Sequence, residues 1–389
     1  MLRYLNAGES HGQGLVAVLE GVPAGLPITA EMVNHDLLRR QGGYGRGGRM
    51  RIEKDQIEFT CGVRKGKTLG NPLGLFIRNK DWENWKDIMA VEPGPPSTKR
   101  VVTRPRPGHA DLVGAIKYGH HDIRNVLEKA SARETAIRVA IGGVAKALLA
   151  QFDMRVVSYT MSIGQVAAPP VDDPLAAYDR AEESQVRCPD TGAGEKMIEL
   201  IRSAKHKGDS LGGVFEVVVT NPPIGLGSYA QWDRRLSARL GMAAMSIQAM
   251  KGVEIGLGFE SARRFGSEVH DDIYHDEAAG QFYRKTNNAG GLEGGISNGQ
   301  PIVIRVAMKP IATLYKPKNS VDIETKEAFQ ATVERSDICT VPAAGVVGEA
   351  VIAYEMANAM LEKFAGDSLE EMKRNFDAYQ EYVKNFSAK

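Results

Sequence analysis

Cysteine is scarce in this 389-residue chain. Its three copies, Cys61, Cys188 and Cys339, are widely separated and form no Cys-x-x-Cys pair, so the sequence predicts neither a disulfide framework nor a thiolate zinc site. Long hydrophobic runs are also missing, since no apolar stretch is long enough to cross a bilayer. The first residues lack the apolar core of a secretory signal. We therefore expect a protein of the reducing cytoplasm with no membrane partner.

The chain has no marked excess of charge of either sign. Its 49 lysines and arginines and 48 aspartates and glutamates leave a formal net charge of +1, whereas nucleic-acid-binding proteins usually carry a broad basic excess. A Gly-x-Gly-x-x-Gly fingerprint between a strand and a helix is likewise absent, which argues against a nicotinamide dinucleotide site. The composition, 25% charged and 43% hydrophobic, is that of a globular enzyme with no nucleic-acid partner.

Glycine, in contrast, is abundant, and one segment combines it with arginine. Residues 42–49 read Gly-Gly-Tyr-Gly-Arg-Gly-Gly-Arg and follow directly on Arg39 and Arg40. The planar guanidinium group donates paired hydrogen bonds to carboxylates and phosphates, and glycine lets a ligand approach the backbone closely. The segment therefore predicts a loop that binds a small polyanion, with a solvated basic loop as the alternative.

Three apolar runs rich in β-branched residues predict strands. They cover residues 15–20, 214–220 and 302–308, and a proline follows each run. Proline ends a strand because it cannot donate a hydrogen bond to the ladder. The similarity of the three runs predicts related strand units in two similar halves of the chain, with chance similarity as the alternative.

Helices are predicted in four places. Ser131 and Glu134 have the spacing of a capping box, which begins one helix. Apolar spacing predicts two more, within 232–250 and within 345–364. A second capping box at Ser368 begins the last.

The order of these elements indicates the fold class. Strands and helices do not alternate strictly, so we expect an α+β fold with antiparallel sheets rather than a doubly wound parallel sheet. Gly142 and Gly143 are expected to weaken the middle of the first helix. Residues 155–210, proline-rich at first and then charged, predict a variable insertion. No safe boundary divides the chain, so we expect a single domain over 1–389.

Two histidines lie in segments suited to chemistry. His11 is accessible beside Gly12, and a histidine side chain can give or take a proton near neutral pH. Its neighbour Ser10 points to the opposite face of an extended chain, which argues against a serine hydrolase. His109 follows Arg106 in a proline-stiffened run, which indicates anion handling. A structural histidine and a rigid surface turn are the respective alternatives.

A further group has the residue types of metal ligands. It consists of His270, Asp271, Asp272, His275 and Asp276. The five-residue spacing of the histidines fits neither one helix face nor a zinc pattern. We expect a solvated acidic loop and no metal site.

Taken together, six segments in this order resemble the chorismate synthase family. They are Gly8-Glu9-Ser10-His11-Gly12, Arg104-Pro105-Arg106-Pro107-Gly108-His109-Ala110-Asp111, Ser131-Ala132-Arg133-Glu134-Thr135-Ala136, Lys251-Gly252-Val253-Glu254-Ile255-Gly256, Gly294-Gly295-Ile296-Ser297-Asn298-Gly299 and Arg335-Ser336-Asp337. No single segment decides the resemblance, but six in order across nearly the whole chain are very specific.

The resemblance implies a carbon–oxygen lyase of the shikimate pathway. The reaction is the anti-1,4-elimination of phosphate from 5-enolpyruvylshikimate 3-phosphate to give chorismate, and it requires reduced FMN without net redox change. The implied fold is a β-α-β sandwich with two antiparallel sheets packed inside helices, assembled as a homotetramer. The source of reduced flavin stays open between an external flavin reductase and the chain's own NADPH-dependent activity.

The resemblance also implies roles for particular residues. Arg40 and Arg46 would be the main substrate contacts, helped by Arg49 and Arg106. Phosphate leaves from an allylic carbon, so the site must supply positive charge and a proton to the departing oxygen, and His11 is the candidate acid. His109 would protonate or hold the reduced flavin. Asp337 would assist near the flavin N5.

Flavin contacts carry over by position. They are Lys129, Ala130, Ser131, Gln248, Ala249, Gly294, Lys309, Pro310, Ile311, Ala312, Thr313 and Arg335. Lys129 stands where the family usually has arginine, so the charge is kept but the guanidinium fork is lost.

Two other classes of function stay open. A flavin reductase that oxidises its substrate would need a nicotinamide site. A non-catalytic anion-binding protein would need no proton donors, although this chain has histidines beside arginine-rich segments. Phosphate release that depends on reduced flavin distinguishes the lyase from both.

Overall fold

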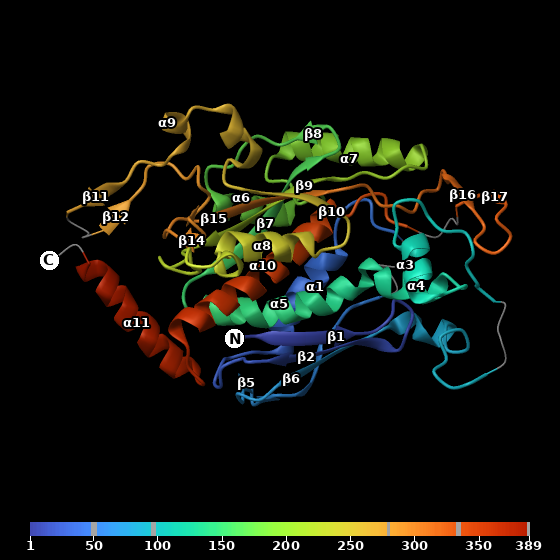
Figure 1. The fold of residues 1–389 in the computed structure, drawn as a ribbon, viewed down its shortest axis with the longest axis horizontal. Helices are drawn as coiled ribbons and strands as arrows, with labels where there is room; N and C mark the ends of the chain where they lie inside the picture. The colour runs from blue at the N-terminus through green and yellow to red at the C-terminus, as the bar shows by residue number, and fades with distance from the viewer. Residues whose placement is uncertain (48–52, 95–98, 278–280, 332–335, 387–389) are drawn as a thin grey trace.

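The computed structural model describes residues 1–47, 53–94, 99–277, 281–331 and 336–386. Two antiparallel sheets form the outer layers, and long helices fill the space between them (Figure 1). This arrangement confirms a mixed helix-and-sheet architecture with antiparallel sheets. No helix within the described ranges is long and apolar enough to span a bilayer.

The first sheet has four strands in the order β1-β2-β6-β3. They are β1 (Arg3–Ala7), β2 (Gly14–Glu20), β6 (Leu73–Arg78) and β3 (Glu58–Cys61). Buried and exposed residues alternate along β2, as expected for a strand with one face on the core and one in solvent. Its connection to β1 is short, and that turn carries His11.

The second sheet has five strands in the order β10-β15-β9-β7-β8. They are β10 (Met250–Ile255), β15 (Ile302–Met308), β9 (Gly213–Thr220), β7 (Arg155–Ile163) and β8 (Val166–Ala167). Two of the three similar runs, β9 and β15, are antiparallel neighbours in this sheet, with Val219 opposite Ile302. The third run, β2, belongs to the other sheet. The three similar runs are therefore not divided in an obvious way between two halves of the chain.

Three helices lie between the sheets. They are α1 (Ala30–Gln41), α5 (Thr135–Ala150) and α10 (Val341–Phe364). Helix α5 packs on β2 and β6, α10 packs on β7 and β9, and the two helices pack against each other. The expectation of sheets inside helices is therefore wrong: helices lie inside the sheets, because α5 and α10 are apolar nearly all round and require cover on both sides.

Shorter elements surround this sandwich. The remaining helices are α3 (Asp111–Tyr118), α4 (Arg124–Ala130), α6 (Pro174–Glu183), α7 (Thr191–His206), α8 (Leu236–Met245), α9 (Gly266–Val269) and α11 (Leu369–Asn385). Four hairpins pair β4 (Val63–Arg64) with β5 (Lys67–Thr68), β11 (Tyr274–Asp276) with β12 (Gln281–Tyr283), β13 (Leu292–Glu293) with β14 (Ile296–Ser297), and β16 (Asn319–Val321) with β17 (Ala328–Gln330). Short 3-10 turns cover Lys80–Asn84, Ala132–Glu134, Trp232–Arg234 and Gly258–Arg263.

The segment 155–210 begins inside the sandwich. Its first nine residues are β7, which pairs along its length with β9. Helices α6 and α7 then pack against β7. The early part of this segment is therefore a strand of the main sheet, and variation among relatives stays a prediction for the rest.

The capping box predicted at residue 131 forms only in part. Ser131 accepts a hydrogen bond from the Arg133 amide at 3.3 Å and begins the 3-10 turn, and α5 follows from Thr135. Glu134 instead accepts hydrogen bonds from Asn6 and Gln248. The side chain of Glu134 therefore ties other segments together rather than capping its own helix.

Candidate functional site

His11 is held in the turn between β1 and β2. Its Nδ1 lies 2.9 Å and 3.0 Å from the two carboxylate oxygens of Glu128, on the last turn of α4. The imidazole also stacks on the Trp85 indole, with ring centroids 3.8 Å apart and planes 20° apart. Its side chain is 15% exposed, whereas that of Glu128 is 1% exposed. The ring is thus fixed by the protein on two sides and keeps limited access to solvent.

The turn 131–135 connects separate parts of the site. Ser10, beside His11, donates through its hydroxyl to that of Ser131 at 3.1 Å. Glu134 accepts a hydrogen bond from the Gln248 amide at 3.0 Å. One short turn at the start of α5 therefore links the β1–β2 connection to the segment that follows α8.

The same turn holds Arg40, at the end of α1. The Arg40 Nε donates to the Thr135 hydroxyl at 2.9 Å, and Nη2 donates to the Ala132 carbonyl at 2.9 Å. Its Nη1 lies 3.5 Å from a carboxylate oxygen of Asp55. Arg133 donates through Nη1 to both oxygens of Asp55 at 2.6 Å and 2.7 Å. Two arginines therefore share one carboxylate.

This pair of buried arginines carries more donors than the protein around it satisfies. Within the described residues, Arg40 Nη1 and Arg133 Nη2 are buried and donate no hydrogen bond. Burial lowers the pKa of Arg40, and the charges of Arg133 and Arg46 add to this effect, although Asp55 opposes it. A buried cation without enough acceptors is costly. An anion in this position would remove that cost.

Arg46 brings a third positive charge to this region. Its Nε lies 3.5 Å from Asp337, whose other oxygen accepts a hydrogen bond from the Gly47 amide. Arg39 does not join the group, because its guanidinium pairs with Glu349 between the sheets. The interpretation of Arg39 as part of the polyanion loop is therefore wrong. Arg49 lies outside the described residues.

The loop that carries Arg46 is fixed to its neighbours. The Tyr44 amide donates to the Gln185 carbonyl at 2.7 Å, and the Ile338 amide donates to the Gly45 carbonyl at 2.8 Å. Gly45 has a φ of 91°, and a Cβ there would lie 2.9 Å from Ile201. Glycine is required at this position by both its backbone conformation and its surroundings.

A cavity of about 820 Å³ opens beside this loop. The polar side chains that line it are mostly basic or hydroxyl-bearing: Tyr44, Arg46, Arg202, Lys205, Tyr315 and Ser336. Such a lining favours an anionic ligand. The predicted polyanion loop therefore borders the large cavity that such a ligand requires.

His109 belongs to a second hydrogen-bonded group. Its Nδ1 lies 2.6 Å from an Asp111 carboxylate oxygen, and Arg106 donates to the same carboxylate through Nε at 2.8 Å and Nη2 at 3.0 Å. Arg106 also donates to the Thr313 hydroxyl at 3.0 Å. Burial would raise the pKa of Asp111, but the hydrogen bonds from His109 and Arg106 outweigh it and lower the pKa well below its usual value.

Residues 309–313 lie against the His109 segment. The Lys309 ammonium donates to the Gly108 carbonyl, and the Lys309 amide donates to the Ala249 carbonyl at 3.0 Å. In the described part of the chain, the carbonyl oxygen of the Gln248 side chain is buried and accepts no hydrogen bond. The segments 248–249 and 309–313, far apart in sequence, are thus neighbours beside His109.

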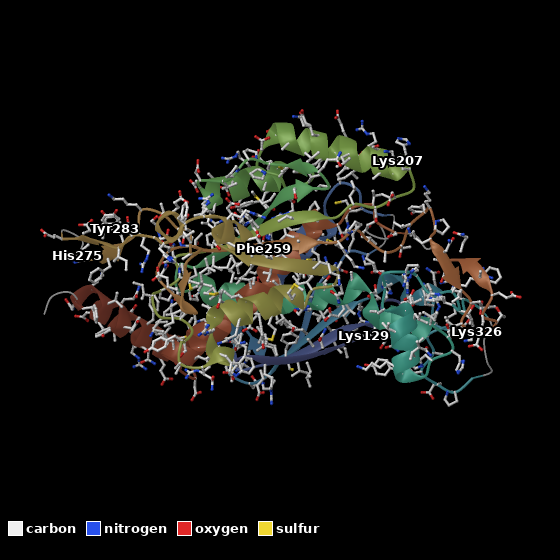
Figure 2. The ribbon with its side chains drawn as sticks, turned by 45° about the horizontal axis from the view of Figure 1, so that its top comes forward. Lys129, Lys207, Phe259, His275, Tyr283 and Lys326 are labelled. Carbon is white, nitrogen blue, oxygen red and sulfur yellow. The ribbon has the colours of Figure 1, made fainter. Side chains whose placement is uncertain are left out.

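Three predicted flavin contacts are not placed in this group. Gly294 turns the β13–β14 hairpin beside the first residue of α8, where Leu236 donates to the Gly295 carbonyl. Gln248 follows the other end of that ten-residue helix, about 15 Å away. Lys129 is exposed at the end of α4, next to Ala130 (Figure 2). Arg335 lies outside the described residues.

The group of possible metal ligands has structural roles instead. Asp271 accepts hydrogen bonds from Thr286, Asn288 and Ala289 and so ties its loop together. His275 lies on the projecting β11–β12 hairpin, next to Phe282 (Figure 2). Nowhere in the described ranges do three His, Cys, Asp or Glu side chains gather as a metal site would require.

Two polar residues of the site were not singled out from the sequence. Arg133 belongs to a predicted helix start and to one of the six segments that resemble the family, but no role is predicted for it; an arginine beside other anion-binding residues is the signal that indicates one. Glu128 precedes the predicted flavin contact Lys129, but nothing local indicates that its partner is His11, 117 residues earlier. Trp85 gave no signal at all.

Comparison with known proteins gives separate evidence on the family of this chain. The sequence model described as chorismate synthase matches residues 2–361. A chorismate synthase from Geobacter metallireducens is 58% identical, with 99% of this chain and 100% of the relative covered, and one from Aquifex aeolicus is 57% identical, with 99% of each covered. A crystal structure of chorismate synthase superposes with a TM-score of 0.81 at 46% identity, covering 99% of this chain and 98% of the other.

The chain belongs to the chorismate synthase family. It is a lyase that converts 5-enolpyruvylshikimate 3-phosphate into chorismate, as members of that family do. The match runs through both histidine groups and the arginine loop, so the site assembled above lies within the part of the chain that the family shares.

Proposed function

We propose that the elimination of phosphate takes place at the group formed by His11, Arg40, Arg46 and Arg133, and that it requires reduced FMN. The observation that carries this proposal is that Arg40 Nη1 and Arg133 Nη2 are buried and make no hydrogen bond within the described residues, although they lie 3.5 Å from Asp55 and 3.9 Å from Glu53 respectively. The substrate carries a phosphate and two carboxylates. It therefore supplies anionic hydrogen-bond acceptors for these two donors.

The arginines bind the substrate and stabilise its leaving group. When the allylic carbon–oxygen bond breaks, its electron pair stays on the phosphate oxygen, so negative charge increases there. Arg40 and Arg133 are held in place by Thr135, Ala132 and Asp55. Their positive charge is thus oriented before the substrate arrives. Arg49 and Arg106 are proposed helpers.

His11 supplies the proton. Its Nδ1 is engaged by Glu128, so Nε2 is the nitrogen left to face a ligand. A protonated Nε2 donates to the departing phosphate oxygen, which leaves as phosphate. General acids of this kind contribute about 10²- to 10⁴-fold to a rate.

The residues beside His109 fit a flavin. The buried Gln248 carbonyl oxygen requires a donor, and Lys309 and Lys129 would supply positive charge for the phosphate of such a cofactor. Residues 309–313, Ala130 and Ser131 offer backbone and hydroxyl groups. When bound, reduced FMN supplies electron density to the substrate. His109, oriented by Asp111, would protonate or hold the flavin, and Asp337 would assist near its N5.

The remaining expectations from the family are also proposals. We propose a cytoplasmic homotetramer that receives reduced flavin from an external reductase or through its own NADPH-dependent activity. Gly294 and Arg335 are proposed flavin contacts. The internal two-half pseudo-symmetry is proposed as well.

Anaerobic phosphate release tests the reaction. The purified protein is mixed with 5-enolpyruvylshikimate 3-phosphate, with and without FMN reduced by dithionite, and phosphate and chorismate are both measured. We expect equal amounts of the two, and only with reduced flavin. In a parallel sample supplied with NADPH and FMN, consumption of NADPH without phosphate release would instead indicate a flavin reductase, and binding of substrate without either would indicate a non-catalytic protein.

A further inference from the structure

Glu128 fastens the β1–β2 turn to the last turn of α4. The His11 amide donates to Oε2 of Glu128 at 2.8 Å, and the Ser10 amide donates to the Glu128 backbone carbonyl at 2.9 Å. The imidazole Nδ1 lies 2.9 Å from Oε1 and 3.0 Å from Oε2. Both the backbone and the side chain of His11 therefore face one buried carboxylate.

Glu128 is itself held and ionised. Arg124, one helical turn earlier, donates to Oε1 at 3.1 Å. Burial would raise the pKa of Glu128, but hydrogen bonds from His11, with the charge of Arg124, lower it below its usual value. An ionised carboxylate only accepts hydrogen bonds. The nitrogen that faces it must therefore carry a hydrogen.

We propose that Glu128 is a positioning residue that keeps the proton of His11 on Nδ1 and so directs Nε2 to the substrate. The tautomer of an imidazole is set by the hydrogen bond that its other nitrogen makes. Trp85, stacked on the ring at 3.8 Å, limits its rotation out of this orientation. The catalytic part of this inference rests on the proposed role of His11 as the acid.

The same contact determines which nitrogen can serve as the acid. Because Nδ1 is engaged by Glu128, the proton that His11 gives to the departing oxygen must come from Nε2. Glu128 thus acts on the reaction through His11 and does not itself touch the reacting atoms. Replacing it should change the rate of the chemical step and leave the binding of substrate to the arginines unchanged.

The tautomer can be measured without flavin or substrate. Protein labelled with ¹⁵N at histidine is compared with the His11→Asn variant to identify the His11 nitrogens by NMR. We expect neutral His11 to carry its hydrogen on Nδ1 in the wild type and to show mixed tautomers in Glu128→Gln. A neutral ring protonated on Nε2 in the wild type would overturn the proposal, whatever the activity of the enzyme.

Kinetics test the effect on the reaction. Glu128→Gln keeps the shape of the side chain, and we expect it to lower kcat by about a hundredfold, within the usual range for a general acid, with substrate Kd changed by less than about twofold. Glu324→Gln is the matched control. Glu324 forms the same contact with His121, 2.7 Å from its Nδ1, on an exposed surface, and its replacement should leave kcat unchanged.

A double variant separates positioning from general stability. If Glu128 acts through His11, then His11→Ala/Glu128→Gln is no slower than His11→Ala alone. If the two effects multiply, Glu128 has an independent structural role and the proposal fails. Normal turnover of His11→Ala together with the expected tautomer would leave the positioning intact and overturn the role of His11 as the acid.

Discussion

Replacement of His11 by alanine separates proton donation from substrate binding. The arginines that bind the substrate lie on other elements, at the end of α1 and at the start of α5. Loss of the imidazole therefore leaves their positions unchanged. We expect His11→Ala to lower kcat by about a hundredfold or more while the Kd values for substrate and flavin stay close to those of the wild type.

The control for this change is a histidine that also pairs with a glutamate but lies outside the site. His121 pairs with Glu324 and its side chain is 86% exposed, so His121→Ala should have wild-type turnover. Stopped-flow measurement of chorismate formation at saturating substrate gives kcat directly. Weak substrate binding combined with an unchanged rate at saturation would make His11 a binding residue.

At the scale of residues, the sequence predicted positions better than partners. Motif resemblance brought His11, His109 and Arg106 to attention, and the structure places each in a defined polar group. The partnership of His11 with Glu128 was not predictable, because 117 residues separate them and only the fold brings them together. Arg39 shows the converse: it shares a basic segment with Arg40 but faces another part of the molecule.

At the scale of elements, the contact between α5 and α10 explains a glycine in the middle of a helix. An added Cβ at Gly142 would lie 2.3 Å from the Ala350 Cβ and 2.4 Å from its Cα. The two helices are therefore as close as their backbones allow. Gly142 was expected to weaken α5, but it is the residue that allows α5 to pack against α10.

We predict that Gly142→Ala destabilises the protein in spite of the better helix propensity of alanine. Propensity favours alanine by about 1 kcal/mol, but overpacking costs about 1–3 kcal/mol when a neighbouring backbone must move. Gly241→Ala in α8 is the control, because its Cβ would meet only Val253 at 3.8 Å. Urea unfolding should show a net loss for the first variant and a gain for the second. Equal or greater stability of Gly142→Ala would contradict this account.

Elements were predictable where local chemistry determines them, but their layering was not. Apolar periodicity identified α10 and the strands β9 and β15 close to their observed bounds. The apolar character of α5 and α10 indicates that both helices are buried, but it does not determine whether they lie outside a sheet or between two sheets. Only the pairing of the strands into two separate sheets, which depends on contacts distant in sequence, decides between these arrangements.

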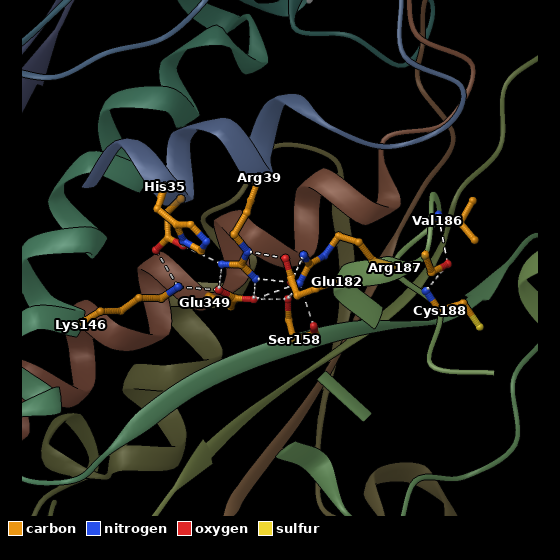
Figure 3. A network of polar contacts seen from close by, with 11 residues as sticks. His35, Arg39, Lys146, Ser158, Glu182, Val186, Arg187, Cys188 and Glu349 are labelled. Carbon is orange, nitrogen blue, oxygen red and sulfur yellow. Dashed lines mark hydrogen bonds and ion pairs between the residues drawn. The ribbon is translucent and has the colours of Figure 1, made fainter. Parts of the chain in front are cut away.

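At the scale of the whole molecule, a buried ionic network joins the layers of the sandwich (Figure 3). At its centre Glu349 of α10 accepts from Arg39 of α1 at 2.8 Å and from Ser158 of β7 at 2.6 Å, and it also pairs with Lys146 of α5. All three inner helices and one strand of the second sheet therefore meet at one carboxylate.

The network is balanced in charge. Its acids are Asp36, Glu182 and Glu349, and its bases are Arg39, Lys146 and Arg187. A balanced buried network contributes little net stability over apolar packing, but removing one member leaves a buried charge uncompensated. The end of α1, which carries Arg40 into the site, is thus fixed by a group whose integrity depends on every member.

Glu349 makes the stability of the molecule depend on pH in the acid range. Burial alone would raise its pKa, but the charges of Lys146 and Arg39 outweigh burial and lower the pKa to about 2 from 4.5. Because the folded pKa lies below the unfolded value, the stabilisation is complete above about pH 4.5 and is lost as the pH falls towards 2. Glu349→Gln should therefore reduce the slope of unfolding free energy against pH in this window.

The same variant should be less stable at neutral pH, where the glutamine cannot balance Arg39, Lys146 and Arg187. We expect a loss of about 3–5 kcal/mol at pH 7, the usual result of breaking a buried ion pair. Glu183→Gln, an exposed change on α6 next to Glu182, controls for the loss of one negative charge and should leave both stability and slope unchanged. Urea unfolding at pH 7, 4 and 3 measures both quantities. If Glu349→Gln kept the wild-type slope of unfolding free energy against pH, the loss of stability in acid would arise from other carboxylates and not from Glu349.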